Sequence, residues 1–314
     1  MLYDSLRSAR LSIDEFTRQR LGQGHETSEE TLTDIFLTKV SPHLRYVQFN
    51  RNQESATGSD WLWWWTDDAG DWFGSLVQAK RLRRSPSSRY SIDVHYNDGK
   101  QIAALYEAAR ILSVVPLYCL YGGPPETRAD LNCGSTHQAT DCSRCASLGV
   151  GLVPALVAER PFTPQRSTDE SARRVIAETI CVEDLALPSS ILCDPRLPDL
   201  NLQNVDLSLD VREFLTNSQS GAREVAKRVF DIVSRERSLH FSSSAAVMTR
   251  QILDYPPIFE QLPDDKGHFR EPYFHHVLRG LRRTPPDYVR QLLDGKDIDC
   301  PMGLDLAGVA VFSL

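Results

Sequence analysis

The sequence lacks long apolar runs, a leader-like start and an even number of cysteines. No apolar stretch in the 314 residues approaches the roughly 18–20 residues that a membrane-spanning helix needs. The first residues, MLYDSLRSARLSIDEF, do not show the basic and then apolar pattern of a signal peptide. Seven cysteines fit reduced thiols better than a disulfide framework. We therefore expect a cytoplasmic protein that has no membrane partner.

Common catalytic and nucleotide-binding motifs are also missing. The sequence has no Walker motif, no dinucleotide-binding glycine pattern, no G-x-S-x-G elbow and no internal repeat. The formal net charge is −7, which argues against a general positive coat for unspecific nucleic-acid binding. A function must therefore be sought in a local group of residues.

The stretch ESATGSDWLWWWTDDAGDWFGSLVQAK, residues 54–80, predicts a β-hairpin. Two aromatic-rich runs flank a turn-prone cluster centred on Ala69. Folding the hairpin about Ala69 places Asp60 opposite Gln78, and the alternation of side chains puts Lys80 on the same face. Opposed residues lie roughly 5 Å apart and diagonal ones roughly 7–8 Å apart. We therefore expect these three side chains to share a ligand.

The three side chains suit a divalent metal beside a phosphate. Asp60 offers a hard carboxylate oxygen and Gln78 a neutral oxygen, the kinds of ligand that Mg²⁺ or Mn²⁺ takes. Lys80 is suited to hold the attacking water or to offset charge on a phosphate. The alternative is an ordinary polar outer face. Against it stand apolar residues on the same face of the hairpin, Leu62, Trp64 and Leu76.

The opposite face of the first hairpin strand carries Trp61, Trp63 and Trp65. Three tryptophans at a spacing of two favour a core wall packed against helices. A platform on which nucleic-acid bases stack is the alternative.

A basic run begins at the proposed site. No acidic residue lies between Asp71 and Asp93. We expect this run to contact a phosphate backbone, and the alternative is a solvated basic loop. Its basic residues are Lys80, Arg81, Arg83, Arg84 and Arg89.

Asp60, the hairpin and the Gln78-Ala79-Lys80 segment resemble the PD-(D/E)XK nuclease superfamily in its QxK form. More closely, GSDWLWWW, VQAKRL and PLYCLY are similar to an uncharacterised bacterial family of that fold, the DUF6615 type. The resemblance covers about residues 28–122 and includes an α–β–β–β–α–β order of elements. Gln78 departs from the commonest pattern, in which an acid stands at this place, and a neutral ligand lowers the charge of the site.

The resemblance implies two further site residues. An acid from the first core helix often completes the metal site in these nucleases, and Glu29 is our candidate, with Glu30 behind it. The alternative is that both acids only complement the helix dipole. A glutamine that opens the helix after the hairpin helps to form the site in the resembled family, which implies a role for Gln101.

A loop over residues 122–147 carries a second candidate metal site. Four soft ligands within a short span could bind a structural zinc ion tetrahedrally, and CxxC is the usual half-site. The spacing matches no common zinc-finger pattern, so unrelated residues of a variable loop are the alternative. The four residues are Cys133, His137, Cys142 and Cys145.

The remaining periodicity predicts helices at 2–22, 100–112 and 221–236, and strands at 45–52, 114–121 and the C-terminus. We also expect Thr27 or Ser28 to cap the second helix, and Thr284 to cap a helix that begins with Pro285. The expected fold is α/β: a restriction-endonuclease-like core, in which helices flank a central mixed sheet, with a helical and loop-rich C-terminal elaboration. The expected divisions are a nuclease core at 1–125, the Cys/His loop at 126–147 and the elaboration at 148–314.

The sequence thus predicts a Mg²⁺- or Mn²⁺-dependent endonuclease that cuts nucleic acid, with DNA preferred. The resemblance suggests a role in bacterial anti-phage defence, with a homo-oligomer or a defence-system component as partner. The alternative is a non-catalytic nucleic-acid-binding or scaffolding subunit of the same fold. A further alternative is that the Cys/His loop is the functional part and recognises a partner.

Overall fold

The computed structural model describes residues 1–49, 60–85, 89–94, 99–132, 143–159, 168–187, 208–238, 258–259 and 273–314. Within these ranges no helix is long and apolar enough to cross a membrane. The N-terminal helices are α1 (Leu2–Gly22), α2 (Glu29–Val40) and the 3-10 turn η1 (Ser41–His43). The later helices are α3 (Lys100–Ile111), α4 (Pro125–Asn132), α5 (Ser143–Ser147), α6 (Ala155–Glu159), α7 (Thr168–Ala177), η3 (Val182–Ala186), α9 (Leu209–Thr216), α10 (Gly221–Ser238), α11 (Tyr273–Leu278), α12 (Asp287–Leu293) and η5 (Pro301–Gly303).

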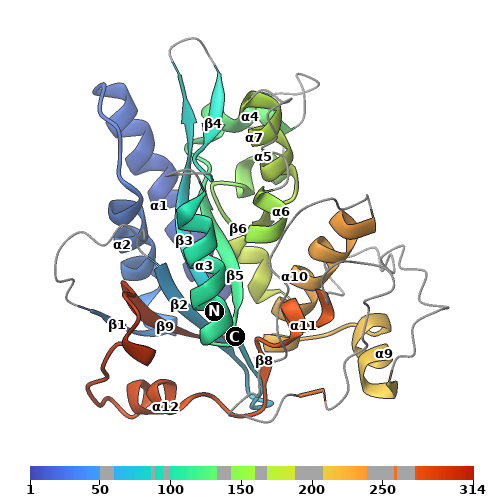
Figure 1. Ribbon diagram of the computed structural model, residues 1–314. Helices are drawn as coiled ribbons and strands as arrows, with labels where there is room; N and C mark the ends of the chain where they lie inside the picture. Colours follow the sequence, from blue (N-terminus) through green and yellow to red (C-terminus); the bar gives the residue numbers. More distant parts are fainter. Residues whose placement is uncertain are drawn as a thin grey trace.

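A mixed sheet forms the centre of the molecule, and helices flank it (Figure 1). Nine strands belong to it, counted over the described ranges, in the order β1-β9-β2-β3-β5-β6-β7, while β4 and β8 also pair with β3. The α/β class and the central mixed sheet expected from the sequence are therefore confirmed. The strands are β1 (Leu44–Gln48), β2 (Asp60–Thr66), β3 (Trp72–Arg84), β4 (Tyr90–Ile92), β5 (Val115–Tyr121), β6 (Val150–Pro154), β7 (Ile180–Cys181), β8 (Leu281–Arg282) and β9 (Gly308–Ser313).

The hairpin of β2 and β3 has the register that the sequence predicted. The two strands are antiparallel, and Asp60 lies opposite Gln78, with the remaining pairs following in order to Thr66 opposite Trp72. In the turn, the Gly70 amide donates to the Asp67 carbonyl at 3.0 Å, and Gly70 adopts a φ of +80°, which glycine accepts without strain. The turn chemistry and the alternation of apolar residues thus agree on one register.

The tryptophans of β2 at odd positions form a core wall, as expected. Trp63 stacks on Phe36 of α2 with ring centroids 5.5 Å apart, and Trp65 stacks on Phe312 of β9 at 4.3 Å. Trp61, Trp63 and Trp65 are all buried. Each buried tryptophan removes roughly 150–250 Å² from water, a transfer free energy of about 4–6 kcal/mol. Because these rings are covered, they do not form a base-stacking platform.

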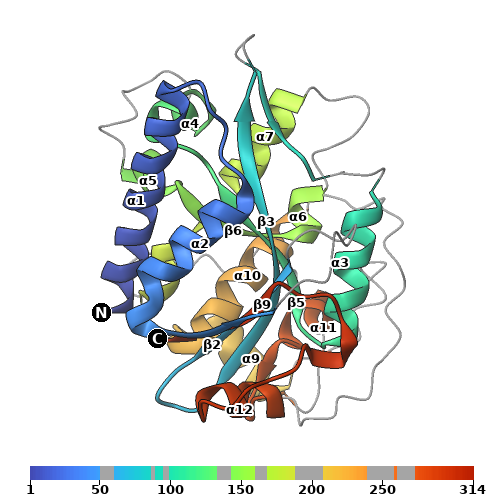
Figure 2. The same ribbon diagram turned by 90° about the vertical axis from the view of Figure 1, so that its left-hand side faces the viewer.

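The two faces of β3 are covered by different helices. Figure 2 shows α1 and α2 on one side of β3 and α3 on the other. The α2 helix begins where the sequence indicated, because the Ser28 hydroxyl accepts from the Thr31 amide at 3.2 Å. The predicted helix at 100–112 is α3, with Ile102, Leu105 and Ala109 buried.

One helix start was predicted incorrectly. We expected Thr284 to cap a helix that begins with Pro285, but α12 begins at Asp287 and Pro286 occupies the N-cap position. A residue that precedes proline is driven out of the helical region, so Pro285 cannot start a helix in front of Pro286.

Strands that follow β5 in the chain join the same sheet as the hairpin. The C-terminal strand β9 lies between β1 and β2, antiparallel to β1 and parallel to β2. Strand β6 pairs with β5, and β8 pairs with the start of β3. The wall of tryptophans is therefore completed by residues about 250 positions further along the chain, such as Phe312 opposite Trp65.

A buried ion network ties α1 to α4 and η3. Arg128 is fully buried and donates to both oxygens of Asp14 at 2.9 and 3.0 Å. Arg10 lies one helical turn before Asp14 and pairs with Glu183 at 2.8 Å. Both guanidinium groups also donate to the carbonyl of Ala146, at 2.7 and 2.8 Å. Every charge in the network therefore has an opposite charge and several hydrogen bonds.

Replacing Asp14 by asparagine should lower the free energy of unfolding by about 3–5 kcal/mol, because Arg128 would keep its buried charge and lose its carboxylate. Urea-induced unfolding measures the change. Glu15→Gln is the control: this neighbour pairs with Arg18 on the surface, and such pairs are worth at most about 1 kcal/mol. Equal losses in the two variants would contradict a structural role for the network.

Candidate active site

The candidate site lies where β2 begins beside β3. Within the described residues, pairing of β3 with β2 stops at Asp60 opposite Gln78. Pairing of β3 with β5 on the other side continues to Arg81 opposite Tyr121. Helix α2 approaches β3 in this region (Figure 2), and Gln101, in the first turn of α3, contacts Lys80. Residues that follow Gln78 on β3 are thus accessible to side chains from both helices.

Lys80 is held by a residue of α3 and a residue of β5. Its Nζ donates to Oε1 of Gln101 at 2.5 Å, and both side chains are buried, with 6% and 8% of their surface exposed. The same Nζ lies 5.9 Å from the ring centroid of Tyr118, within the range of a cation–π contact. The structure therefore brings together Lys80 and Gln101, two of the residues that were predicted for the site.

Gln78 is buried on β3, two residues before Lys80 and so on the same face of the strand. Its backbone lies opposite Asp60, the pairing that the hairpin predicted. The side chain of Asp60 lies outside the described part of the structure, so its distance to the other two groups stays a prediction. Gln78 contributes an amide in the place where an acid would add a negative charge.

Glu29 is the first residue of α2 and is half-buried. Burial raises the pKa of its carboxyl above the usual range, and the positive charges of Lys80, Arg83 and Arg81 act in the opposite direction. These basic residues therefore lie close enough to Glu29 to act on its carboxyl. Glu30, the second choice from the sequence, is exposed.

The basic run extends from the site to the surface. Arg81 is half-buried and forms an ion pair with Glu26 from the segment between α1 and α2, whereas Arg83, Arg84 and Arg89 are exposed. The hydrogen bond from Arg81, together with the charges of Arg81 and Arg83, lowers the pKa of Glu26. Glu26 is thus the partner of Arg81, a contact that no pattern in the sequence indicated.

The second candidate metal site falls mostly outside the described residues. Cys133, His137 and Cys142 belong to residues that the structure does not describe, so the predicted zinc site stays untested. Cys145 lies in α5, where it is buried, and its carbonyl accepts from Nε of Arg128 at 2.7 Å. In the described ranges no three residues among His, Cys, Asp and Glu form a group that could hold a metal ion.

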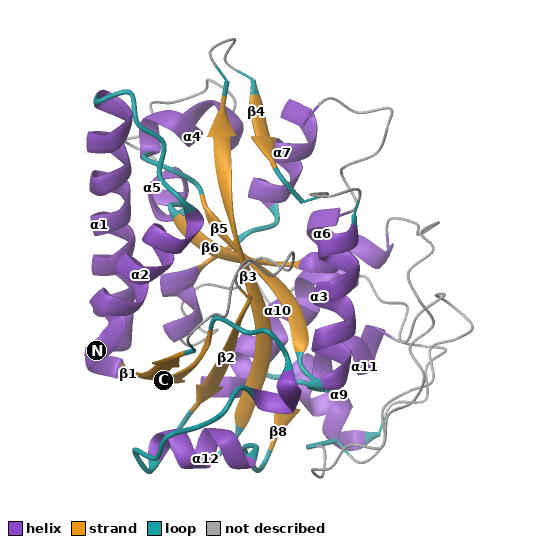
Figure 3. Ribbon diagram, turned by 60° about the vertical axis from the view of Figure 1, so that its left-hand side comes forward, coloured by secondary structure: helices purple, strands orange, loops and turns teal. Residues whose placement is uncertain are grey.

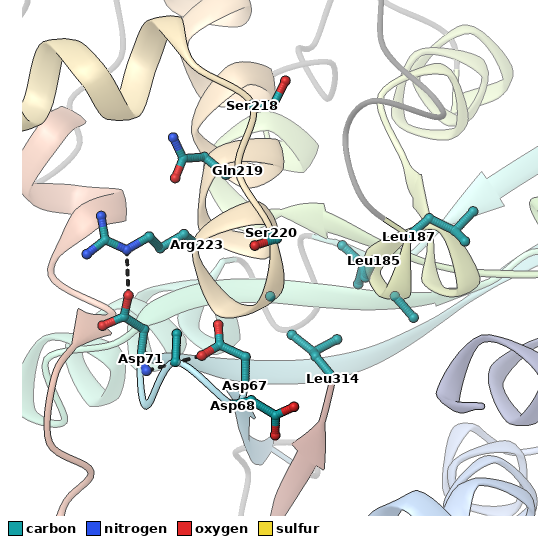
Figure 4. Close-up of a pocket in the computed structure, with 13 residues that line it drawn as sticks. Asp67, Asp68, Asp71, Leu185, Leu187, Ser218, Gln219, Ser220, Arg223 and Leu314 are labelled. Carbon is teal, nitrogen blue, oxygen red and sulfur yellow. Dashed lines mark hydrogen bonds and ion pairs between the residues drawn. The ribbon is translucent and has the colours of Figure 1, made fainter.

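A pocket of about 420 Å³ lies at the opposite end of the hairpin, at its turn (Figure 4). Two of the three aspartates that line it contact α10. Asp67 accepts from the Ala222 amide at 2.8 Å, and Asp71 pairs with Arg223 at 2.5 Å. Gly221 has no Cβ that would collide with Asp67, which allows this approach. The pocket therefore marks the place where the hairpin turn caps α10, a contact that the sequence did not reveal.

Comparison with family models gives one match, over residues 2–314, to a model described as a family of unknown function, DUF6615. The chain belongs to the DUF6615 family. A search of curated proteins and a search of solved structures each found no match. The DUF6615 assignment extends over nearly the whole chain, including the strands that join the sheet from its second half. The description of the family makes no statement about activity.

Replacing Glu29 by glutamine should stabilise the protein at pH 7, because the charged form of a carboxyl whose pKa is raised on folding costs stability. The raised pKa of Glu29 contributes stability to the folded state below the unfolded-state pKa. That stability is lost as the pH rises through the folded-state pKa. The gain from Glu29→Gln should therefore vanish below about pH 4. Urea unfolding at several pH values measures it.

Glu30→Gln is the matched control, because this exposed neighbour also lies in the first turn and loses the same interaction with the helix dipole. If Glu29→Gln were less stable than Glu30→Gln at pH 7, burial of Glu29 would not have the assigned effect.

Proposed function

We propose that this protein is a metal-dependent endonuclease of the PD-(D/E)XK type, in its QxK form, and that it cleaves DNA. The observation that supports it most directly is the buried ammonium of Lys80, oriented by Gln101 at 2.5 Å and placed two residues after Gln78. An orienting contact on a buried lysine is what positioning of a water or a phosphate oxygen would need. The exposed arginines that follow supply contacts to the phosphate backbone.

The donor groups of the proposed site fit a hard divalent cation. Asp60 and Glu29 would provide carboxylate oxygens and Gln78 an amide oxygen, the ligand types of Mg²⁺ and Mn²⁺. When bound, such an ion lowers the pKa of a coordinated water and neutralises charge on the phosphate. In this proposal Lys80 holds the nucleophile and stabilises the charge that develops on the phosphate. Gln101 and Tyr118 keep the ammonium in place.

A non-catalytic nucleic-acid-binding or scaffolding protein of the same fold is the second candidate. It is favoured by the neutral Gln78, at a position where the commonest form of these nucleases carries an acid, and by the net charge of −7. A role in anti-phage defence in the bacterial cytoplasm, with a homo-oligomer or a defence-system component as partner, is part of the proposal. It follows from the resemblance to these nucleases alone.

Incubation of the purified protein with supercoiled plasmid and Mg²⁺ or Mn²⁺ should produce nicked and linear DNA. Asp60→Asn and Lys80→Met should each lower the initial rate at least about 100-fold, because each removes a group that acts in the reaction. Lys80→Met keeps a flexible side chain of similar length and removes the ammonium. Binding of the plasmid, measured without metal, should be retained in both variants.

Lys296→Met is the control, because this exposed lysine pairs only with Asp294 among the described contacts. Its cleavage rate should equal that of the wild type. If the wild type binds DNA but cuts neither DNA nor RNA with either metal, the nuclease proposal is wrong and the binding protein remains.

A further inference from the structure

A chain of buried hydroxyl groups links the start of α2 to β5. Thr33 lies one helical turn after Glu29, and its hydroxyl donates to the Glu29 carbonyl at 2.9 Å. The same Thr33 oxygen lies 2.9 Å from the hydroxyl oxygen of Tyr121 in β5. Thr33 and Tyr121 are both buried, and Figure 3 shows α2 on one side of β3 and α3 on the other. The chain therefore runs through the core from the sheet to the first turn of α2.

The number of hydrogens fixes the direction of this chain. A hydroxyl carries one hydrogen, and Thr33 gives its own to the Glu29 carbonyl, so Tyr121 is the donor to Thr33. The thiol of Cys119, two residues earlier in β5, is hydrogen-bonded to Tyr121 and donates to its oxygen for the same reason. Burial raises the pKa of the Tyr121 hydroxyl well above its usual range and the pKa of the Cys119 thiol to about 12. Both groups therefore keep their hydrogens at neutral pH.

The chain is anchored on β5 next to the candidate site. In the parallel pairing of β3 with β5, Ala79 lies opposite Cys119 and Arg81 opposite Tyr121, on either side of Lys80. Strand β5 is buried along its whole length and pairs with β3 and β6. Helix ends fray when only their own backbone bonds hold them. A first turn that is tied to this strand is therefore held in a defined position relative to β3.

The carboxyl of Glu29 lies in the same first turn. Lys80 and Tyr121 point to opposite faces of the sheet, yet the charge of Lys80 acts on the Glu29 carboxyl more strongly than the charges of Arg83 and Arg81. Within the described residues this carboxyl forms neither a hydrogen bond nor an ion pair. Its position therefore depends on how the main chain of the first turn of α2 is held.

The core by itself does not need these hydroxyl groups. Two buried hydrogen-bonding partners can be replaced together by apolar groups of the same shape at little cost in stability. Phenylalanine at position 121 and valine at position 33 would therefore pack in the same space. What the hydroxyl pair adds is a directed contact that fixes the first turn of α2. Metal ligands require such contacts behind them, because a ligand oxygen must be held within about 0.5 Å of its working position.

We propose that Tyr121, acting through Thr33, is a positioning residue that holds Glu29 in place as a ligand of the divalent metal ion. This inference rests on the proposed nuclease function and extends its site to β5 and the core of α2. Neither hydroxyl takes part in the chemistry.

The test titrates the full-length protein with Mn²⁺ and measures the free ion by electron paramagnetic resonance. Tyr121→Phe removes one hydroxyl and keeps the ring, and Thr33→Val removes the other and keeps the shape. Each should raise the dissociation constant for Mn²⁺ at least about 10-fold, the usual effect of losing a contact behind a metal ligand. Glu29→Gln should raise it as well. Thr33→Ser, which keeps the hydroxyl, should retain the wild-type value.

Plasmid cleavage gives a second measurement that separates positioning from a general structural role. In Tyr121→Phe, the Mn²⁺ concentration that gives half of the maximal rate should rise at least about 10-fold. The rate at saturating Mn²⁺ should stay near the wild-type value, because excess metal restores occupancy of the site. An unchanged half-maximal concentration with a lower maximal rate would contradict the positioning role.

Thr179→Val is the matched control. The Thr179 hydroxyl is also buried, and it donates to the carbonyl four residues earlier, that of Val175 in α7, at 2.8 Å. This variant therefore loses the same kind of helix contact as Thr33→Val, far from Glu29 in the chain, and should keep the wild-type affinity for Mn²⁺. Urea unfolding of every variant separates loss of metal affinity from loss of fold.

Wild-type affinity for Mn²⁺ in both Tyr121→Phe and Thr33→Val, with weaker binding by Glu29→Gln, would overturn the inference and retain the metal site. Wild-type affinity in Glu29→Gln would overturn it too, because Glu29 would then not be a ligand. A wild-type protein that binds no Mn²⁺ refutes the metal-dependent nuclease, and the positioning role of Tyr121 with it.

Discussion

The register between β2 and β3 is the constraint on which the candidate site depends. Side chains of a strand alternate between the two faces of a sheet, so a slip by one residue would move Lys80 from the α3 side to the α2 side. The pairing is held in the middle of the hairpin and at its turn. The aromatic wall on α2 and β9 fixes the middle of β2, and Asp67 caps α10 at the turn. The polar site at the far end is thus supported by apolar and capping contacts that take no part in it.

The site concentrates polar groups in a setting where they reduce stability. The ammonium of Lys80 is buried, where it donates to the neutral amide of Gln101 and lies against the ring of Tyr118, and burial has removed it from water. Glu29 has a raised pKa although three basic residues act on it. In a core such groups would be disfavoured. Buried polar and charged groups that gather at one point, beside exposed arginines, are typical of a site for anionic ligands.

The two buried charge systems of the molecule differ in how their charges are balanced. In the network of Arg128, Asp14, Arg10 and Glu183, each charge has an opposite charge and added carbonyl contacts. This network joins α1 to segments more than 100 residues away and has no exposed member. At the candidate site, by contrast, Lys80 is buried, while Arg81 is half-buried and Arg83 is exposed. The first arrangement is suited to hold helices together, and the second to receive a ligand from solvent.

The hairpin register, the cap at Ser28, the boundaries of α1 and α3 and the core role of the tryptophans could be predicted from the sequence. These features depend on residues close in the chain, where the spacing of apolar side chains and the turn residues act directly. Tertiary structure decided the insertion of β9 between β1 and β2, the contact of Lys80 with Tyr118, the pairing of Arg81 with Glu26 and the capping of α10 by Asp67. Each of these joins segments that are distant in sequence, and pairing across such distances is set by the packing of the whole sheet and leaves no local periodicity.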